Sequence, residues 1–193
     1  MSLESRTRCW VGLLILFALA ASTGCAHRPH IPLGDRGTGP PLRAEIPEVP
    51  FYPQQSYQCG PAALAMVLNW SGAPVVPEQV ADEMFTPARQ GSLQPMLVAA
   101  ARHHRRLPYL IDDFEALIRE IAAGHPVVVL QNLGLSWYPR WHYAVVVGYD
   151  SQKQRIVLRS GNVSRKVMGW PLFLRTWNRA GNWGLLVMPL DKL

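Results

Sequence analysis

Cysteine is scarce in this chain of 193 residues, which holds three: Cys9, Cys25 and Cys59. So few thiols cannot build a dense disulfide framework, and no group of His, Cys and Asp has the spacing of metal ligands. A Gly-rich phosphate-binding loop is also missing, so neither a cofactor nor a metal is expected. Charged residues make up only 17% and the net charge of +6 is scattered, so no nucleic-acid partner is expected.

Long hydrophobic runs are missing beyond the N-terminus. The apolar stretch from Trp10 to Ala20 is too short to span a bilayer comfortably, and Arg6 and Arg8 precede it. The residues Ala21-Ser22-Thr23-Gly24-Cys25 that follow resemble the signal of a bacterial lipoprotein, whose cysteine is lipidated and becomes the mature N-terminus. Ser22 departs from that pattern, which usually has an aliphatic residue there. An ordinary cleaved signal peptide or an uncleaved anchor is the alternative.

These features divide the chain into three parts. We expect residues 1–24 to form a lipoprotein-type signal peptide, residues 25–47 a Pro-rich tether without a core of its own, and residues 48–193 a folded domain. Ala26, rather than an acidic residue, follows Cys25, and in Gram-negative lipoproteins this resemblance implies the outer membrane. The expected location is the bacterial cell envelope, where a lipid anchor at Cys25 would hold the domain facing the periplasm.

The pattern of the folded part changes midway. Apolar periodicity, caps and breakers predict helices first, at residues 60–70, 76–85, 93–104 and 112–123. Short β-rich runs follow at residues 126–130, 143–149, 155–158 and 183–188, with a small helix at 170–177. Helices followed by an antiparallel sheet predict an α+β fold.

Cys59 is the one thiol expected to stay free, since Cys9 would leave with the signal and Cys25 would be acylated. It opens the first predicted helix. Unpaired N–H groups and the positive end of the dipole at a helix start favour the thiolate, which is the nucleophilic form of cysteine. Gly60 allows close backbone approach and Pro61 fits the first turn. An inert buried cysteine is the structural alternative.

His142 is the candidate for the base that accepts the thiol proton. It begins an apolar run that predicts a rigid central strand, and among the other histidines only His125 is a credible rival. A tetrahedral intermediate also needs hydrogen-bond donors for its oxyanion. The backbone N–H of Cys59 is one donor, and the side-chain amide of Gln54 or Gln55 is the other.

Two blocks carry a family resemblance. They are Pro53-Gln54 with Tyr57-Gln58-Cys59-Gly60-Pro61-Ala62-Ala63, and the later run His142-Tyr143-Ala144-Val145-Val146-Val147-Gly148-Tyr149-Asp150. Together they resemble the papain-like double-glycine peptidases, the bacteriocin-processing enzymes and their stand-alone relatives, over residues from about 50 to 190. The resemblance implies a papain-like fold, with N-terminal helices packed on a C-terminal antiparallel sheet. It also implies Cys59 as nucleophile, His142 as general base and Gln54 in the oxyanion hole.

One position departs from the family pattern. The family usually carries an Asp-Pro pair on the strand after the histidine strand, and that Asp orients the imidazole. Ser160 stands at the corresponding place here, followed by Gly161-Asn162. Serine offers no charge to an imidazolium, whereas an asparagine takes the orienting role in papain-like proteases. We therefore expect Asn162, in preference to Ser160, to complete the site.

The function expected from these residues is that of an envelope-anchored cysteine peptidase, which hydrolyses a peptide or protein substrate through an acyl-enzyme. Two alternatives stay open. A non-catalytic peptide-binding module of the same fold would explain the missing Asp. A Cys-His peptidoglycan hydrolase would use the same pair, although such enzymes usually follow the nucleophile with Ser, not Gly60-Pro61.

Overall fold

A computed structural model describes residues 39–54, 58–84 and 92–190 of the chain. The chain divides into two compact units, Met1–Pro32 and Leu33–Leu193, and every described residue belongs to the second. The expected signal peptide and the lipidation at Cys25 lie outside the described residues, as does Gln55. They stay predictions.

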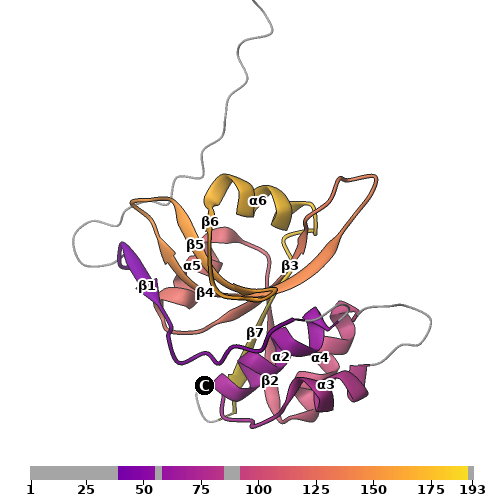
Figure 1. Cartoon of the computed structure of the whole chain (residues 1–193). Helices are drawn as coiled ribbons and strands as arrows, with labels where there is room; N and C mark the ends of the chain where they lie inside the picture. The colour runs from indigo at the N-terminus through magenta and orange to yellow at the C-terminus, as the bar shows by residue number, and fades with distance from the viewer. Residues whose placement is uncertain (1–38, 55–57, 85–91, 191–193) are drawn as a thin grey trace, which may run out of the picture. The chain divides into compact units, whose positions relative to one another are not determined.

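In the described part of the chain, seven strands form one antiparallel sheet (Figure 1). Six lie in the spatial order β2 (Arg106–Ile111), β7 (Gly184–Pro189), β3 (Val127–Asn132), β4 (Trp141–Asp150), β5 (Arg155–Ser160) and β6 (Val163–Gly169). β1 (Arg43–Glu45) pairs with the last three residues of β4 and so extends that edge beyond the end of β3.

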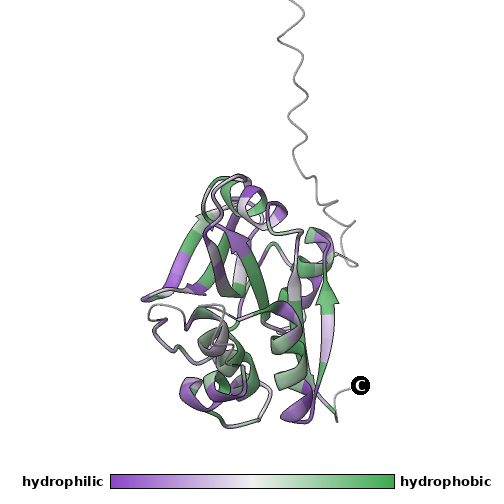
Figure 2. Ribbon diagram, turned by 90° about the vertical axis from the view of Figure 1, so that its right-hand side faces the viewer, coloured by the Kyte–Doolittle hydropathy of each residue, from purple (hydrophilic) through white to green (hydrophobic). Residues whose placement is uncertain are grey.

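The central strands are apolar on both faces because helices cover them. Every residue of β3 and of β7 is buried. Hydrophobic stretches run along the strands, and hydrophilic stretches lie on the outer helices (Figure 2).

Three of the five helices in the described residues form one cluster (Figure 1): α2 (Cys59–Trp70), α3 (Pro77–Met84) and α4 (Gln94–His103). α2 is the innermost, since it contacts α3, α4, β3 and β4 and buries every residue from Gly60 to Leu68. A helix that is apolar all round is stable only when it is enclosed in this way.

The other two helices, α5 (Phe114–Ala122) and α6 (Trp170–Asn178), contact other parts of the sheet. α6 packs on β3, β5 and β6, and the ring of Phe114 from α5 meets that of Trp170 edge-on at 5.1 Å. This ring contact joins α5 to α6.

The predicted papain-like α+β architecture is confirmed: helices come first along the chain and pack on an antiparallel sheet. Three strands, β1, β2 and β6, were not expected. β1 also corrects the predicted boundary at residue 48, because Arg43–Glu45 pair with Asp150–Gly148 and Ile46 is buried. The Pro-rich composition hid this strand, since its hydrogen-bond partners lie about a hundred residues away.

Candidate active site

Cys59 is the first residue of α2, and its thiol is free and half-buried. Gln58 precedes the helix without a side-chain cap, and the first helical hydrogen bond runs from the Ala62 N–H to the Gln58 carbonyl at 3.0 Å. The N–H groups before Ala62 therefore have no partner within the helix. The structure thus places Cys59 at the helix start, where the sequence predicted it.

Gly60 is required for packing beside Cys59. A Cβ at this position would lie 2.6 Å from the Cβ and the Oγ of Ser92. The Tyr143 hydroxyl donates a hydrogen bond to the Ser92 carbonyl at 3.2 Å, which fixes the segment before α4 against β4. Burial, together with the charge of Cys59, raises the pKa of Tyr143, so this hydroxyl stays protonated.

His142 is the second residue of β4 and is half-buried. Its Nε2 lies 2.9 Å from the Ser160 hydroxyl, at the end of the neighbouring strand β5. Burial, reinforced by the charge of Lys166, lowers the pKa of His142 to about 4. The imidazole is therefore neutral at neutral pH, with its Nδ1 left for a second partner.

The preference for Asn162 as the partner of His142 is not supported by this geometry. Ser160 pairs with Val163 across β5 and β6, so Gly161 and Asn162 form a two-residue turn, with Gly161 at a φ of +60°. A residue at the tip of such a turn points its side chain into solvent, and Asn162 is exposed. Ser160, only 3% exposed, is instead the residue that is hydrogen-bonded to the imidazole. The Gly-Asn pair between Ser160 and Val163 is typical of a two-residue hairpin turn, so the sequence could have predicted this turn.

Gln54 connects the segments that carry these residues. Its side chain is 8% exposed; Nε2 donates to the Tyr143 carbonyl at 3.1 Å and to the Cys59 carbonyl at 3.5 Å. Its Oε1 accepts the Gly161 N–H at 2.7 Å, and its own backbone N–H donates to the Gly161 carbonyl at 3.0 Å. One amide thus joins the start of α2, the residue after His142 and the residue after Ser160.

The thiol and the imidazole are not hydrogen-bonded to each other. Within the described residues Cys59 makes no side-chain hydrogen bond, and the His142 ring is bonded to Ser160 alone. Gln54 also has both amide hydrogens directed at carbonyl oxygens, so it holds the site together in this state. The bond of 3.5 Å to the Cys59 carbonyl is the weaker of the two. His125, the rival base, is bonded to Glu120 at 2.9 Å.

The β3–β4 hairpin next to His142 presents aromatic rings to solvent. Trp137 is 81% exposed, and Tyr138 and Trp141 are also exposed. The hairpin is held rigidly, because the buried Asn132 accepts the N–H groups of Gly134 and Arg140, both at 2.9 Å. An ordered backbone that keeps large rings in water is typical of a contact surface.

Residues 39–54, 58–84 and 92–190 contain no group of three His, Cys, Asp or Glu side chains that could hold a metal ion. The same residues contain no helix that is both long enough and apolar enough to cross a membrane.

Comparisons with known proteins agree with the observed fold. The profile of the Peptidase_C39 like family matches residues 46–184. Among solved structures, a C39-like peptidase from Bacillus anthracis superposes with a TM-score of 0.65 at 18% identity, over 76% of this chain and 97% of that one.

Two further structures share the fold. A double glycine motif protease from an AMS/PCAT transporter, solved with its leader peptide, gives a TM-score of 0.57 at 20% identity, over 78% of this chain and 97% of that one. Xylellain, a cysteine protease from Xylella fastidiosa, gives a TM-score of 0.58 at 12% identity, over 79% of this chain and 87% of that one. A search of curated proteins found no match. The family profile covers most of the folded domain, and the chain therefore belongs to the Peptidase_C39 like family.

Proposed function

We propose that this protein is an active cysteine peptidase in which Cys59 attacks the carbonyl carbon of a peptide bond. The thiol proton passes to His142 and then to the leaving amine, and the resulting thioester at Cys59 is hydrolysed by a water that His142 deprotonates. The observation that carries the proposal is the Gln54 amide, which bonds at once to the segments of Cys59, His142 and Ser160. A buried amide with these three partners maintains their relative positions.

The hydrogen bond between His142 and Ser160 supports the role of the base. With Nε2 donating to the Ser160 hydroxyl, Nδ1 carries the lone pair that accepts the thiol proton. A pKa of about 4 keeps that lone pair available at neutral pH. The bond between sulfur and imidazole would form on substrate binding, since catalytic hydrogen bonds are often long without substrate.

The oxyanion of the tetrahedral intermediate would be stabilised by two donors. One is the N–H of Cys59, which has no partner within the helix at the start of α2. The other is Gln54 Nε2, which would exchange its weak bond to the Cys59 carbonyl for the oxyanion. Its stronger bond to Tyr143 would persist during this exchange and keep the amide in place.

The direct test is digestion of a peptide library by the purified full chain, with new termini identified by mass spectrometry. Peptides containing Gly-Gly belong in the library, because a related protease is a double glycine motif protease. We expect cleavage that Cys59→Ala abolishes while the folded state is retained. Identical cleavage by the parent and by Cys59→Ala would refute the proposal.

A non-catalytic binding module is the second candidate, favoured by the neutral Ser160 in place of an acid. A thiol-directed active-site probe separates the two. An enzyme would be labelled at Cys59 faster than a denatured control, and this enhancement would require His142. A binding module would show no such enhancement.

We also propose that the domain is anchored in the cell envelope through a lipid on Cys25. The support is the sequence pattern around Cys25 alone. Metabolic labelling with an alkyne-tagged fatty acid, followed by fractionation of the membranes, tests it. The label should appear on the parent chain and disappear in Cys25→Ala; an equally labelled variant would refute the lipid anchor.

A further inference from the structure

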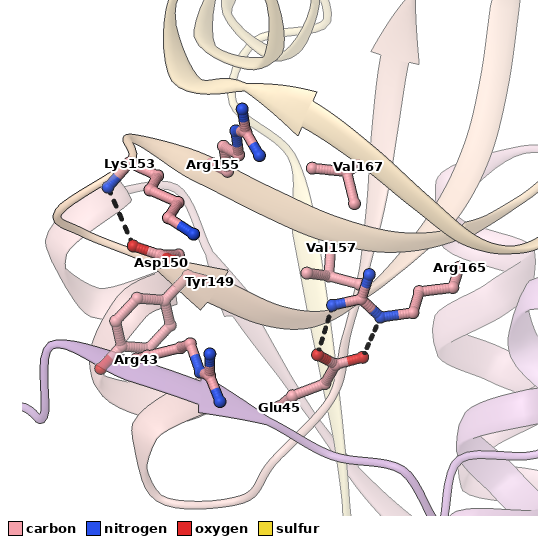
Figure 3. A pocket seen from close by; sticks show the side chains of 9 residues that line it. All are labelled: Arg43, Glu45, Tyr149, Asp150, Lys153, Arg155, Val157, Arg165 and Val167. Carbon is pink, nitrogen blue, oxygen red and sulfur yellow. Dashed lines mark hydrogen bonds and ion pairs between the residues drawn. The ribbon is translucent and has the colours of Figure 1, made fainter.

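A second polar site lies at the far end of the β4–β5 pair from His142 and Ser160. A cavity of about 220 Å³ opens there between β1, the β4–β5 turn and β6 (Figure 3). Its floor includes Val157, and charged side chains surround it: Arg43, Glu45, Asp150, Lys153, Arg155 and Arg165.

This cavity is separate from the candidate active site. Side chains alternate between the two faces of a strand, so Arg155 and Val157 point to the opposite face from Ile156 and Ser160. Arg155 also pairs with Asp150 at the end of β4, whereas His142 lies at its beginning. The two sites therefore differ both in position along the strands and in the face that they use.

Both carboxylates of the cavity are already engaged. Glu45 binds Arg165 in a bidentate pair, with distances of 2.7 and 2.8 Å, and the neighbouring arginines help to lower the pKa of Glu45. Asp150 accepts the backbone N–H of Lys153 at 2.9 Å (Figure 3). The two carboxylates thus help to position the positively charged side chains around the cavity, which we call the cationic rim.

Positive charge is in excess in the cavity, because four cations (Arg43, Lys153, Arg155 and Arg165) line it against the two carboxylates of Glu45 and Asp150. The side chains of Arg43, Lys153 and Arg155 make no ion pair or hydrogen bond with any part of the chain that the structure describes. They come from the strand β1, the β4–β5 turn and the strand β5, and all three line the same hollow (Figure 3). Asp150, the cross-strand neighbour of both Arg43 and Arg155, offsets only part of this charge, so the repulsion that remains favours a bound anion.

We propose that this cavity binds a phosphate group. A phosphate offers several acceptor oxygens and more than one negative charge, which match two guanidinium groups and an ammonium better than a single carboxylate does. The volume is sufficient for one phosphate with a few waters. The group belongs either to free phosphate or to the phosphorylated headgroup of a lipid, and both present the same chemistry.

The test is calorimetric titration of the full chain with inorganic phosphate at constant ionic strength. We expect saturable binding at one site. Lys153→Ala/Arg155→Ala should weaken it by about tenfold or more, because two charge-assisted hydrogen bonds are lost. Arg102→Ala removes an exposed charge from α4 and serves as the matched control, with an affinity within about twofold of the parent.

Two outcomes would overturn the proposal. One is the lack of saturable heat up to about 50 mM phosphate, since a built site should bind in the millimolar range or tighter. The other is equal binding by the parent and the double variant. Because all three substitutions are on exposed side chains, their thermal unfolding should match that of the parent.

A second arm identifies the source of the phosphate. Vesicles of phosphatidylcholine with phosphatidylglycerol are sedimented with the parent and with the double variant. If the double variant loses vesicle binding as well as phosphate affinity, the cavity binds a lipid headgroup. Unchanged sedimentation together with lost phosphate binding assigns it to a soluble phosphate.

Discussion

The two ends of the β4–β5 pair stabilise polar groups in opposite ways. At one end His142, Ser160 and Gln54 are largely removed from water and joined by hydrogen bonds between neutral groups. At the other end Arg43, Lys153 and Arg155 remain exposed and charged. The hydrogen-bonded end depends on short distances between neutral groups. The cationic end depends on the summed charge of its exposed side chains.

This difference predicts how each end responds to substitution. A buried polar network loses much when one member is removed, because its partners are left without hydrogen bonds in a medium of low dielectric constant. Exposed cations are screened by solvent and salt, so losing one changes binding but hardly changes folding.

Gln54→Leu should have the largest effect. It leaves the Gly161 N–H and the Tyr143 carbonyl without their partner, which should lower the free energy of unfolding by about 3 kcal/mol and remove peptidase activity. Urea denaturation measures the first quantity. Gln58→Leu is the matched control, because Gln58 makes no side-chain cap bond, and it should stay within about 1 kcal/mol of the parent. Equal losses in both variants would show that Gln54 is not a structural link.

Acid should destabilise the folded state through His142. Burial lowers its pKa from the ordinary value of 6.5 to about 4 in the folded state, so the unfolded chain binds more protons between these limits. Stability should therefore rise as the pH increases from 4 to 6.5, by at most about 3 kcal/mol. His142→Gln should flatten the unfolding free energy in this window. A parental slope that persists in His142→Gln would assign the titration to another group.

Ser160→Ala should slow hydrolysis more than Asn162→Ala. Loss of the bond to Nε2 should lower kcat/KM by about tenfold, whereas removal of the exposed Asn162 side chain should change it by less than about twofold. The acid limb of kcat/KM should lie near pH 4 in the parent and move to higher pH in Ser160→Asp, because a carboxylate stabilises the imidazolium. The reverse ranking of the two alanine variants would restore Asn162 as the orienting residue.

The smallest effect is expected at the cationic end. Lys153→Ala/Arg155→Ala should change the free energy of unfolding by less than about 0.5 kcal/mol and leave kcat/KM at the parental value. Thermal unfolding and peptide hydrolysis check both quantities. A loss of activity comparable to that of Ser160→Ala would mean that the two ends are coupled.

Much of the candidate site could be predicted from the sequence because its signals are local. A cysteine before Gly-Pro at the start of an apolar helix defines the position of Cys59 by itself, and the run after His142 defines β4. The family resemblance then favoured Gln54 over Gln55 as the side-chain donor of the oxyanion hole. The fold class followed from the order of helical and alternating patterns.

The rest depended on contacts between distant segments. β2 contains Pro108 and begins directly after a basic helix end, so its pairing with β7 left no periodic signal. The choice between Ser160 and Asn162 required the turn geometry that only the β5–β6 register sets. The cationic cavity depends on β1 lying beside β4, and no local pattern predicts that pairing.

The most direct test of the central claim, that Cys59 and His142 act together, uses an activated ester such as p-nitrophenyl acetate. The parent should acylate Cys59 in a rapid burst and then turn over steadily. His142→Ala should accumulate the acyl group on Cys59, detectable by mass spectrometry, with turnover reduced by at least about a hundredfold. Steady turnover by His142→Ala at the parental rate, or acylation of the parent at a residue other than Cys59, would contradict the account.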